Sequence, residues 1–153
     1  MREAPDRGGE NSETGFGRIL ERKLFLFLLD LEVKRAHRYQ NFLSILILKL
    51  ARSPHGNNAA GWMACHGMLA GMLNEEIRES DIVGSLGEDN LVVLLPYADI
   101  SAGSIVKSRV ETHLNHIDPG SNGFEVSVRQ VNFPMNGTRA IDLIRKAVDE
   151  QSV

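Results

Sequence analysis

Apolar and polar positions follow two different periods along the chain, and the change of period separates helices from strands. Residues 18–39 contain no Pro or Gly, and their apolar residues recur at helical spacing. Residues 42–50 form a nearly continuous apolar run, which is typical of a buried strand. The pattern also predicts helices over 59–78, 101–116 and 138–149, a strand over 124–133, and a hairpin of 81–86 and 91–95 around the turn 87–90.

The predicted order of elements is α–β–α–β–β–α–β–α. Without the first and last helices this order is βαββαβ, the ferredoxin-like core. We therefore expect an α+β fold with an extra N-terminal helix and a C-terminal helix. The sheet should contain antiparallel strands, with the helices packed mainly on one face. In the helix over 59–78 the expected inner residues are Met63, Leu69, Met72, Leu73 and Ile77.

The first predicted helix is apolar on several sides. Leu20, Leu24, Phe27, Leu28 and Leu31 fall on one stripe, and Phe25, Leu26, Leu29 and Val33 add apolar surface outside it. A helix with this much apolar surface needs more than one neighbour. Two interpretations remain open: the helix packs on the sheet and is partly covered by the preceding residues, or it forms a dimer or interdomain contact.

Composition limits the class of protein. The 153 residues are enough for one domain, which we expect over 18–153, and the charged, Gly-containing residues 1–17 indicate a flexible leader or linker. A net charge of −3 argues against nucleic acid as a partner. The apolar runs are too short to cross a bilayer, so no membrane insertion is expected. With one cysteine, Cys65, and no apolar signal core, the prediction is a cytoplasmic protein.

The hairpin carries the most informative motif. Arg78 and Asp81 form an RxxD pattern, five residues follow, and then comes Gly87-Glu88-Asp89-Asn90-Leu91, before an apolar strand that ends in Pro96. This arrangement resembles the hairpin of the GGDEF (diguanylate cyclase) family, in which RxxD precedes the GGDEF signature at the same distance. The resemblance covers roughly residues 18–149. It implies the palm-like fold of nucleotide cyclases and a role in bacterial signalling.

The resemblance also shows where this chain departs from the family. The family condenses two GTP molecules into cyclic di-GMP with two divalent metals, which need carboxylate ligands. At the matching positions this chain has Lys49, Asp89 and Asn90, and Glu88 replaces the second signature glycine. The guanine-reading segment, near residues 56–63, also lacks the family's polar pairs. We therefore expect no catalysis, no bound metal and no cofactor, and we interpret 87–90 as an ordinary polar turn.

A second site of the family remains recognisable. In the family the RxxD motif binds cyclic di-GMP away from the catalytic centre, often with an arginine from the next helix, which by residue count is Arg109. The resemblance thus implies a cyclic di-GMP receptor with Arg78, Asp81 and Arg109 as ligand-binding residues. Arg78 and Asp81 could instead form only a surface ion pair. The alternative function is a scaffold without nucleotide, which binds a protein partner or a second copy through the first helix. His113 and His116 could share a metal, but no third ligand is evident.

Overall fold

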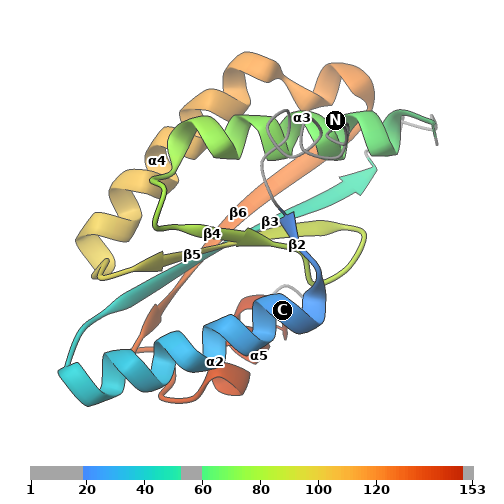
Figure 1. Ribbon diagram of the computed structural model, residues 1–153. Coiled ribbons are helices and arrows are strands. Elements are labelled where there is room, and N and C mark those ends of the chain that lie inside the picture. The colour runs from blue at the N-terminus through green and yellow to red at the C-terminus, as the bar shows by residue number, and fades with distance from the viewer. Residues whose placement is uncertain (1–18, 53–59, 150–153) are drawn as a thin grey trace, which may run out of the picture.

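The computed structural model describes residues 19–52 and 60–149 (Figure 1). The leader predicted over 1–17 lies outside these residues, and so do residues 56–59 of the guanine-reading segment expected near residues 56–63. The described elements are β2 (Ile19–Leu20), α2 (Arg22–Tyr39), β3 (Leu43–Arg52), α3 (Ala60–Glu76), β4 (Ile82–Gly84), β5 (Asn90–Pro96), α4 (Ile100–Ile117), the 3-10 helix η1 (Pro119–Asn122), β6 (Phe124–Phe133) and α5 (Ala140–Asp149). The predicted α+β order, with its βαββαβ core and two additional helices, is confirmed. No helix among the described residues is long and apolar enough to cross a membrane.

The five strands form one sheet in the order β2-β4-β5-β3-β6. β3 pairs antiparallel with β5 on one side and with β6 on the other, so the longest apolar run of the chain lies inside the sheet. β2 adds a short parallel edge, in which Ile19 and Leu20 pair with Val83 and Gly84. The first helix therefore begins at Arg22 rather than at residue 18.

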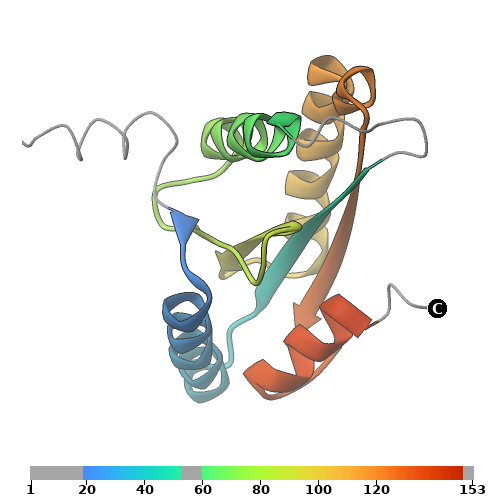
Figure 2. The same cartoon turned by 90° about the vertical axis from the view of Figure 1, so that its right-hand side faces the viewer.

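The helices cover both faces of the sheet, and the prediction of one covered face is wrong. α3 and α4 lie on one face, and α2 and α5 lie on the other (Figure 2). The reason is visible in β3, whose alternate residues enter two separate apolar clusters. Leu46, Leu48 and Leu50 pack with α3 and α4, whereas Leu43, Ile45 and Ile47 pack with α2 and α5. A strand that is apolar at successive positions needs cover on both sides.

α2 packs on the sheet with a different stripe from the predicted one. Its buried residues are Phe25, Leu29, Val33 and Ala36. Gly84 explains this choice, because a Cβ at Gly84 would lie 2.6 Å from Cδ1 of Phe25, closer than such carbons approach. Phe25 thus occupies space that only glycine leaves free on β4. Three residues of the predicted stripe instead face outward, with Leu24, Phe27 and Leu31 exposed by 42%, 60% and 41%, whereas Leu20 packs partly against the core.

α3 also differs from its predicted inner face at one position. Leu69, Met72 and Leu73 are buried as predicted, and Ile77 packs partly against the same cluster. Met63 is 76% exposed, so its assignment to the core is wrong. The buried stripe of α3 runs through Cys65, Leu69 and Leu73 at a spacing of four residues, and Met63 lies outside it.

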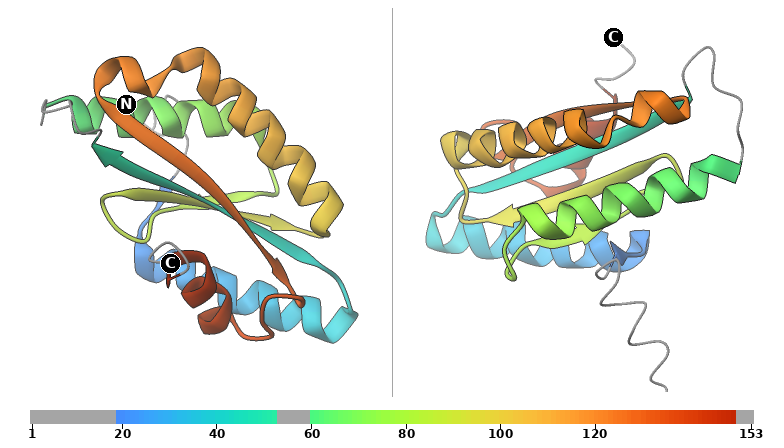
Figure 3. Two further views of the ribbon diagram at one scale, coloured as in Figure 1. Left: turned by 180° about the vertical axis from the view of Figure 1, so that it is seen from behind. Right: turned by 90° about the horizontal axis from the view of Figure 1, so that it is seen from above.

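α4 approaches the sheet closely at Gly103. A Cβ there would overlap the side chains of Ser44 and Gln130. Ser44 is buried and its hydroxyl donates to the carbonyl oxygens of Ala98 and Asp99, which lead into the helix. The Asp99 carboxylate caps the helix by accepting from the N–H of Ala102 at 2.9 Å. These contacts fix the start of α4 against the sheet. α4 also contacts α3, and the two helices lie side by side on one face (Figure 3).

Candidate functional site

β3 and β5 bring together the hairpin residues that replace the expected acidic positions. Lys49 lies opposite Asn90 in the pairing of the two strands. Nζ of Lys49 is 3.7 Å from Oδ2 of Asp89, and both side chains are partly exposed. Such a pair contributes about 0–1 kcal/mol to stability. The charge of Asp89 is therefore balanced within the protein.

Asn90 uses its amide group inside the turn. Its Oδ1 accepts from the N–H of Leu86 at 2.8 Å, and its Nδ2 donates to Oδ1 of Asp89 at 3.1 Å. The Ser85 hydroxyl bonds to the carbonyl oxygen of Asn90 at 3.2 Å and to that of Gly87. Gly87 and Glu88 are exposed at the tip. This arrangement is that of a polar hairpin turn with its side chains bonded to its own backbone.

Metal-binding side chains do not gather at this hairpin. Within residues 19–52 and 60–149 no group of three or more His, Cys, Asp or Glu is placed to hold a metal ion. His113 and His116 have separate partners: Nδ1 of His113 is 2.9 Å from Oε2 of Glu76, and Nδ1 of His116 is 2.9 Å from the carbonyl oxygen of Thr112.

The structure brings Arg78 and Asp81 together just after α3. The backbone N–H of Arg78 donates to Oδ2 of Asp81 at 2.8 Å, and Nη2 of Arg78 donates to Oδ1 at 3.2 Å. The same Nη2 donates to the carbonyl oxygen of Pro96, at 3.2 Å, at the end of β5. The Asp81 side chain is only 2% exposed, whereas that of Arg78 is 62% exposed. Asp81 therefore holds the guanidinium group through Nη2, while most of the Arg78 side chain stays accessible.

Arg109 is held by a residue that the sequence did not indicate. Its Nη2 donates to the carbonyl oxygen of Glu76 at 2.7 Å, and its Nε donates to Oε1 of Glu76 at 3.3 Å. The other carboxylate oxygen of Glu76 contacts His113. Glu76 thus bridges the end of α3 and two residues one turn apart on α4. The only local signal for this cluster is the spacing of Arg109 and His113 on one helix face.

The three predicted ligand-binding residues line one cleft. It has a volume of about 280 Å³ and lies between the end of β5, the start of α4 and the segment after α3; it is lined by Arg78, Asp81, Leu95, Tyr97, Ala98, Ala102, Ile105, Val106 and Arg109. Its walls are apolar apart from the two arginines, Asp81 and the hydroxyl of Tyr97. Sequence reasoning missed Tyr97, which comes directly after the proline that ends the strand. A cleft of this character suits a flat ring whose edge carries hydrogen-bonding groups.

Comparison with known families decides the identity. The family described as "Diguanylate cyclase, GGDEF domain" matches residues 16–151. The chain belongs to the GGDEF family. The sequence resemblance drawn from the hairpin is thereby confirmed, and the GGDEF domain extends over nearly the whole chain. Among curated proteins, none matches this GGDEF domain.

Solved structures agree with this assignment at the level of the fold. The GGDEF domain is similar to a DGC protein from Thermotoga maritima, with a TM-score of 0.76 and 18% identity over 91% of this chain and 98% of that chain. It is also similar to the GGDEF domain of DgcB from Caulobacter crescentus in complex with c-di-GMP (TM-score 0.66, 13% identity, 87% and 81% covered). A third similar structure is the diguanylate cyclase SiaD in complex with its activator SiaC from Pseudomonas aeruginosa (TM-score 0.58, 19% identity, 85% and 55% covered).

Proposed function

We propose that this chain is a GGDEF domain without cyclase activity that binds cyclic di-GMP through Arg78 and Asp81, with Arg109 as a third contact. The observation that carries the proposal is the pairing of Arg78 with Asp81 at the mouth of a cleft that Arg109 also lines. Guanine presents O6 and N7 as adjacent acceptors, and the planar fork of arginine meets both. The accessible edge of Arg78 is available for that contact.

The roles of the two acidic partners differ in this proposal. Both oxygens of Asp81 accept from Arg78 in a nearly buried position, which supports Asp81 as the residue that orients the guanidinium group. Glu76, at the end of α3, holds Arg109 of α4 in a comparable way. The cleft is large enough for one guanine and its sugar rather than for the whole ligand. The rest of the cyclic dinucleotide would therefore extend over the exposed surface beside α4.

Loss of catalysis is supported by the charge at the hairpin. Two divalent metals would need carboxylate oxygens near the C-terminal end of β3, at the position of Lys49, and in the turn. The residues present do not fit that requirement, because the Lys49 ammonium group already pairs with Asp89 and the Asn90 amide is used by the backbone of the turn. A cation at this position would be repelled by Lys49. We derive no catalytic step for this chain.

Relatives supply precedents for a ligand and for a partner. The DgcB domain from Caulobacter crescentus was crystallised with c-di-GMP, and SiaD from Pseudomonas aeruginosa was crystallised with its activator SiaC. By analogy, this chain would sense cyclic di-GMP in bacterial signalling and pass the signal to a protein partner or a second copy. A location in the cytoplasm stays a prediction from the sequence.

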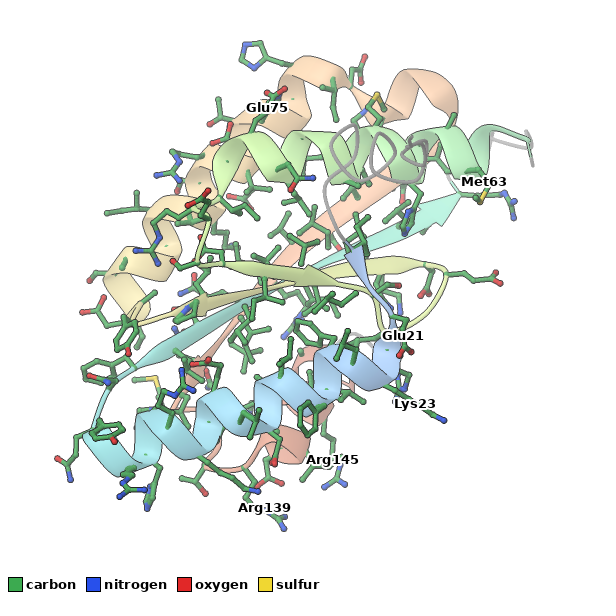
Figure 4. All side chains as sticks on the ribbon, in the orientation of Figure 1. Glu21, Lys23, Met63, Glu75, Arg139 and Arg145 are labelled. Atoms are coloured by element: carbon green, nitrogen blue, oxygen red, sulfur yellow. The ribbon has the colours of Figure 1, made fainter. Side chains whose placement is uncertain are left out.

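The binding of cyclic di-GMP can be measured by isothermal titration calorimetry. We expect the wild-type protein to bind and Arg78→Ala to lose about 5- to 150-fold in affinity, because a bidentate arginine–guanine contact provides about 1–3 kcal/mol of discrimination. Arg145→Ala is the matched control. This arginine is exposed on α5, in the other helix layer (Figure 4), and its removal should leave the affinity unchanged. Absence of binding heat with the wild-type protein would refute the receptor proposal.

The second candidate function is protein interaction through α2 without any nucleotide. The outward stripe of Leu24, Phe27 and Leu31 favours it, because these large apolar side chains lie at helical spacing on one face. The sequence left open whether this helix packs on the sheet or forms a dimer or interdomain contact. α2 does pack on the sheet through its buried residues, and the exposed stripe supports an additional contact with a partner.

A further inference from the structure

We propose that Tyr97 is the platform on which a base stacks when it occupies the Arg78 cleft. This inference rests on the proposed function and names a specificity and affinity determinant that the arginine and aspartate do not supply. Tyr97 lies between the end of β5 and the start of α4 and lines the same cleft as Arg78, Asp81 and Arg109. It is 67% exposed, so its ring faces solvent and not the core.

The backbone places the ring next to the arginine. Nη2 of Arg78 donates to the carbonyl oxygen of Pro96, and that carbonyl belongs to the peptide unit that leads into Tyr97. The guanidinium group and the start of the aromatic side chain are therefore fixed at one point of the chain. A guanine whose edge meets Arg78 would bring its face to the side where Tyr97 emerges.

Other lining residues of the cleft leave room for a ring. Ala98 and Ala102 are small, and Ile105 on the second turn of α4 is largely exposed. A flat base could lie between the Tyr97 ring and the apolar surface of α4, with its polar edge toward Arg78. Apolar faces combined with a polar edge are the pattern by which proteins read purines.

The conformation of Tyr97 points in the same direction. Its φ is 62°, in the left-handed region that bulky residues rarely adopt. Glycine or asparagine would adopt it more easily, so a tyrosine at this position is unfavourable for the fold alone. Since the ring is mostly exposed, core packing offsets little of that strain. Residues held in such a conformation are concentrated at ligand-binding sites.

A purely structural role for the ring is the competing explanation. Tyr97 also lines a small hollow beside Phe42 and Leu43, where it could cover the end of the sheet. The two explanations differ in what happens on removal of the ring. A covering role predicts a loss of stability, and a stacking role predicts a loss of affinity without a loss of stability.

The test is a calorimetric titration with cyclic di-GMP, together with thermal unfolding of each protein. Tyr97→Phe keeps the ring and should bind within about twofold of wild type, whereas Tyr97→Gly should bind about tenfold or more weakly. Glycine suits the positive φ, so the melting temperature of Tyr97→Gly should not fall. Tyr97→Asn, which also tolerates this backbone, should lose as much affinity as the glycine variant. Tyr39→Ala is the matched control, since Tyr39 is the other, equally exposed tyrosine and does not line the cleft.

The outcomes separate this inference from the proposed function. Binding by wild type that is unchanged in both Tyr97→Gly and Tyr97→Asn would overturn the stacking role and leave the Arg78 site intact. Lowered melting temperatures with unchanged affinity would assign Tyr97 a covering role instead. Failure of wild type to bind would overturn both. A direct readout is the NMR spectrum of the wild-type protein, in which the Tyr97 ring protons should move upfield as the base stacks on them.

Discussion

Lys49 and Asp89 form an ion pair without disturbing the strand that carries the lysine. The backbone pairing of β3 and β5 continues through Lys49 and Asn90. The ammonium group of Lys49 lies 3.7 Å from Oδ2 of Asp89, so the local charge is close to neutral. The hairpin keeps its pairing, and under the proposed function its local charge accounts for the exclusion of the family's chemistry.

A turnover assay tests this exclusion. Incubation of the protein with GTP and Mg²⁺ or Mn²⁺ should yield no cyclic di-GMP above a protein-free control, because neither Lys49 nor Asn90 can act as a carboxylate ligand. The product is measured by chromatography, with an active GGDEF domain as the positive control under the same conditions. Abundant product would show that the metals are held in another way.

Residue contacts were predictable from sequence only where they are local. The pairing of Arg78 with Asp81 follows from a spacing of three residues at the end of a helix, and the structure contains it. The contact of Arg109 with Glu76 joins residues 33 positions apart and depends on how α3 packs against α4. No periodicity in the sequence contains that information. The binding roles of Arg78, Asp81 and Arg109 stay predictions until a titration is done.

At the scale of elements, the sequence predicted an element correctly where its apolar residues have a clear period. Where that period is weak or the element is very short, the prediction failed. The strand predicted over 124–133 has those limits in the structure, because alternation and flanking turns define it. α2 is apolar on several sides, so its buried face could not be read from its own sequence. Gly84 on another element selects that face. β2 was missed because two residues become a strand only by pairing with β4.

α5 offers a pH-dependent test of one helix end. Arg139 donates to both oxygens of Asp142, from Nε at 3.0 Å and from Nη2 at 3.2 Å, just before and within the first turn. This hydrogen bonding, with the positive charges of Arg139 and Arg145, holds the pKa of Asp142 below its ordinary value of 3.8. A carboxylate near a helix N-terminus also interacts favourably with the helix dipole.

The sign of the effect follows from linkage. A folded-state pKa below the unfolded value gives stability that is present above pH 3.8 and is lost as the pH falls through the folded-state pKa. Asp142→Asn should therefore lower the melting temperature slightly at pH 7, and the difference from wild type should vanish in acid. Thermal unfolding followed by circular dichroism between pH 7 and pH 2 measures it. A difference that does not change with pH would contradict the assigned cause.

At the scale of the whole molecule, the sheet separates two different surfaces. One helix layer, α3 and α4, borders the Arg78 cleft, and the other, α2 and α5, carries the exposed apolar stripe (Figure 2). A ligand and a partner could therefore bind at once without competing for the same residues. The charged substitutions that would test the stripe must be placed at Phe27 or Leu24. From the sequence alone we would expect Leu26 or Leu29 to be the exposed positions for such a charge. That expectation is wrong, because Leu29 is fully buried and Leu26 packs partly against the core.

Sedimentation velocity over a range of concentrations tests the stripe as a contact between copies. We expect concentration-dependent association of the wild type and a shift to monomer in Phe27→Glu, because a charge in the centre of an apolar contact cannot be solvated there. Ser101→Glu adds the same charge to the exposed start of α4, in the other layer, and should leave association unchanged. A wild-type protein that remains monomeric at every concentration would contradict self-association.

Because Gly84 has no side chain, this residue of β4 determines which residues α2 exposes on its outer side. Phe25 can pack on the sheet only because position 84 carries no side chain. The position of Phe25 in turn fixes the rotation of α2 about its axis. Even a single methyl group at position 84 would roll or lift α2 and so present another set of side chains to the outside. A substitution at Gly84 could thus change which partner binds the outer face of α2, although the partner would not contact residue 84.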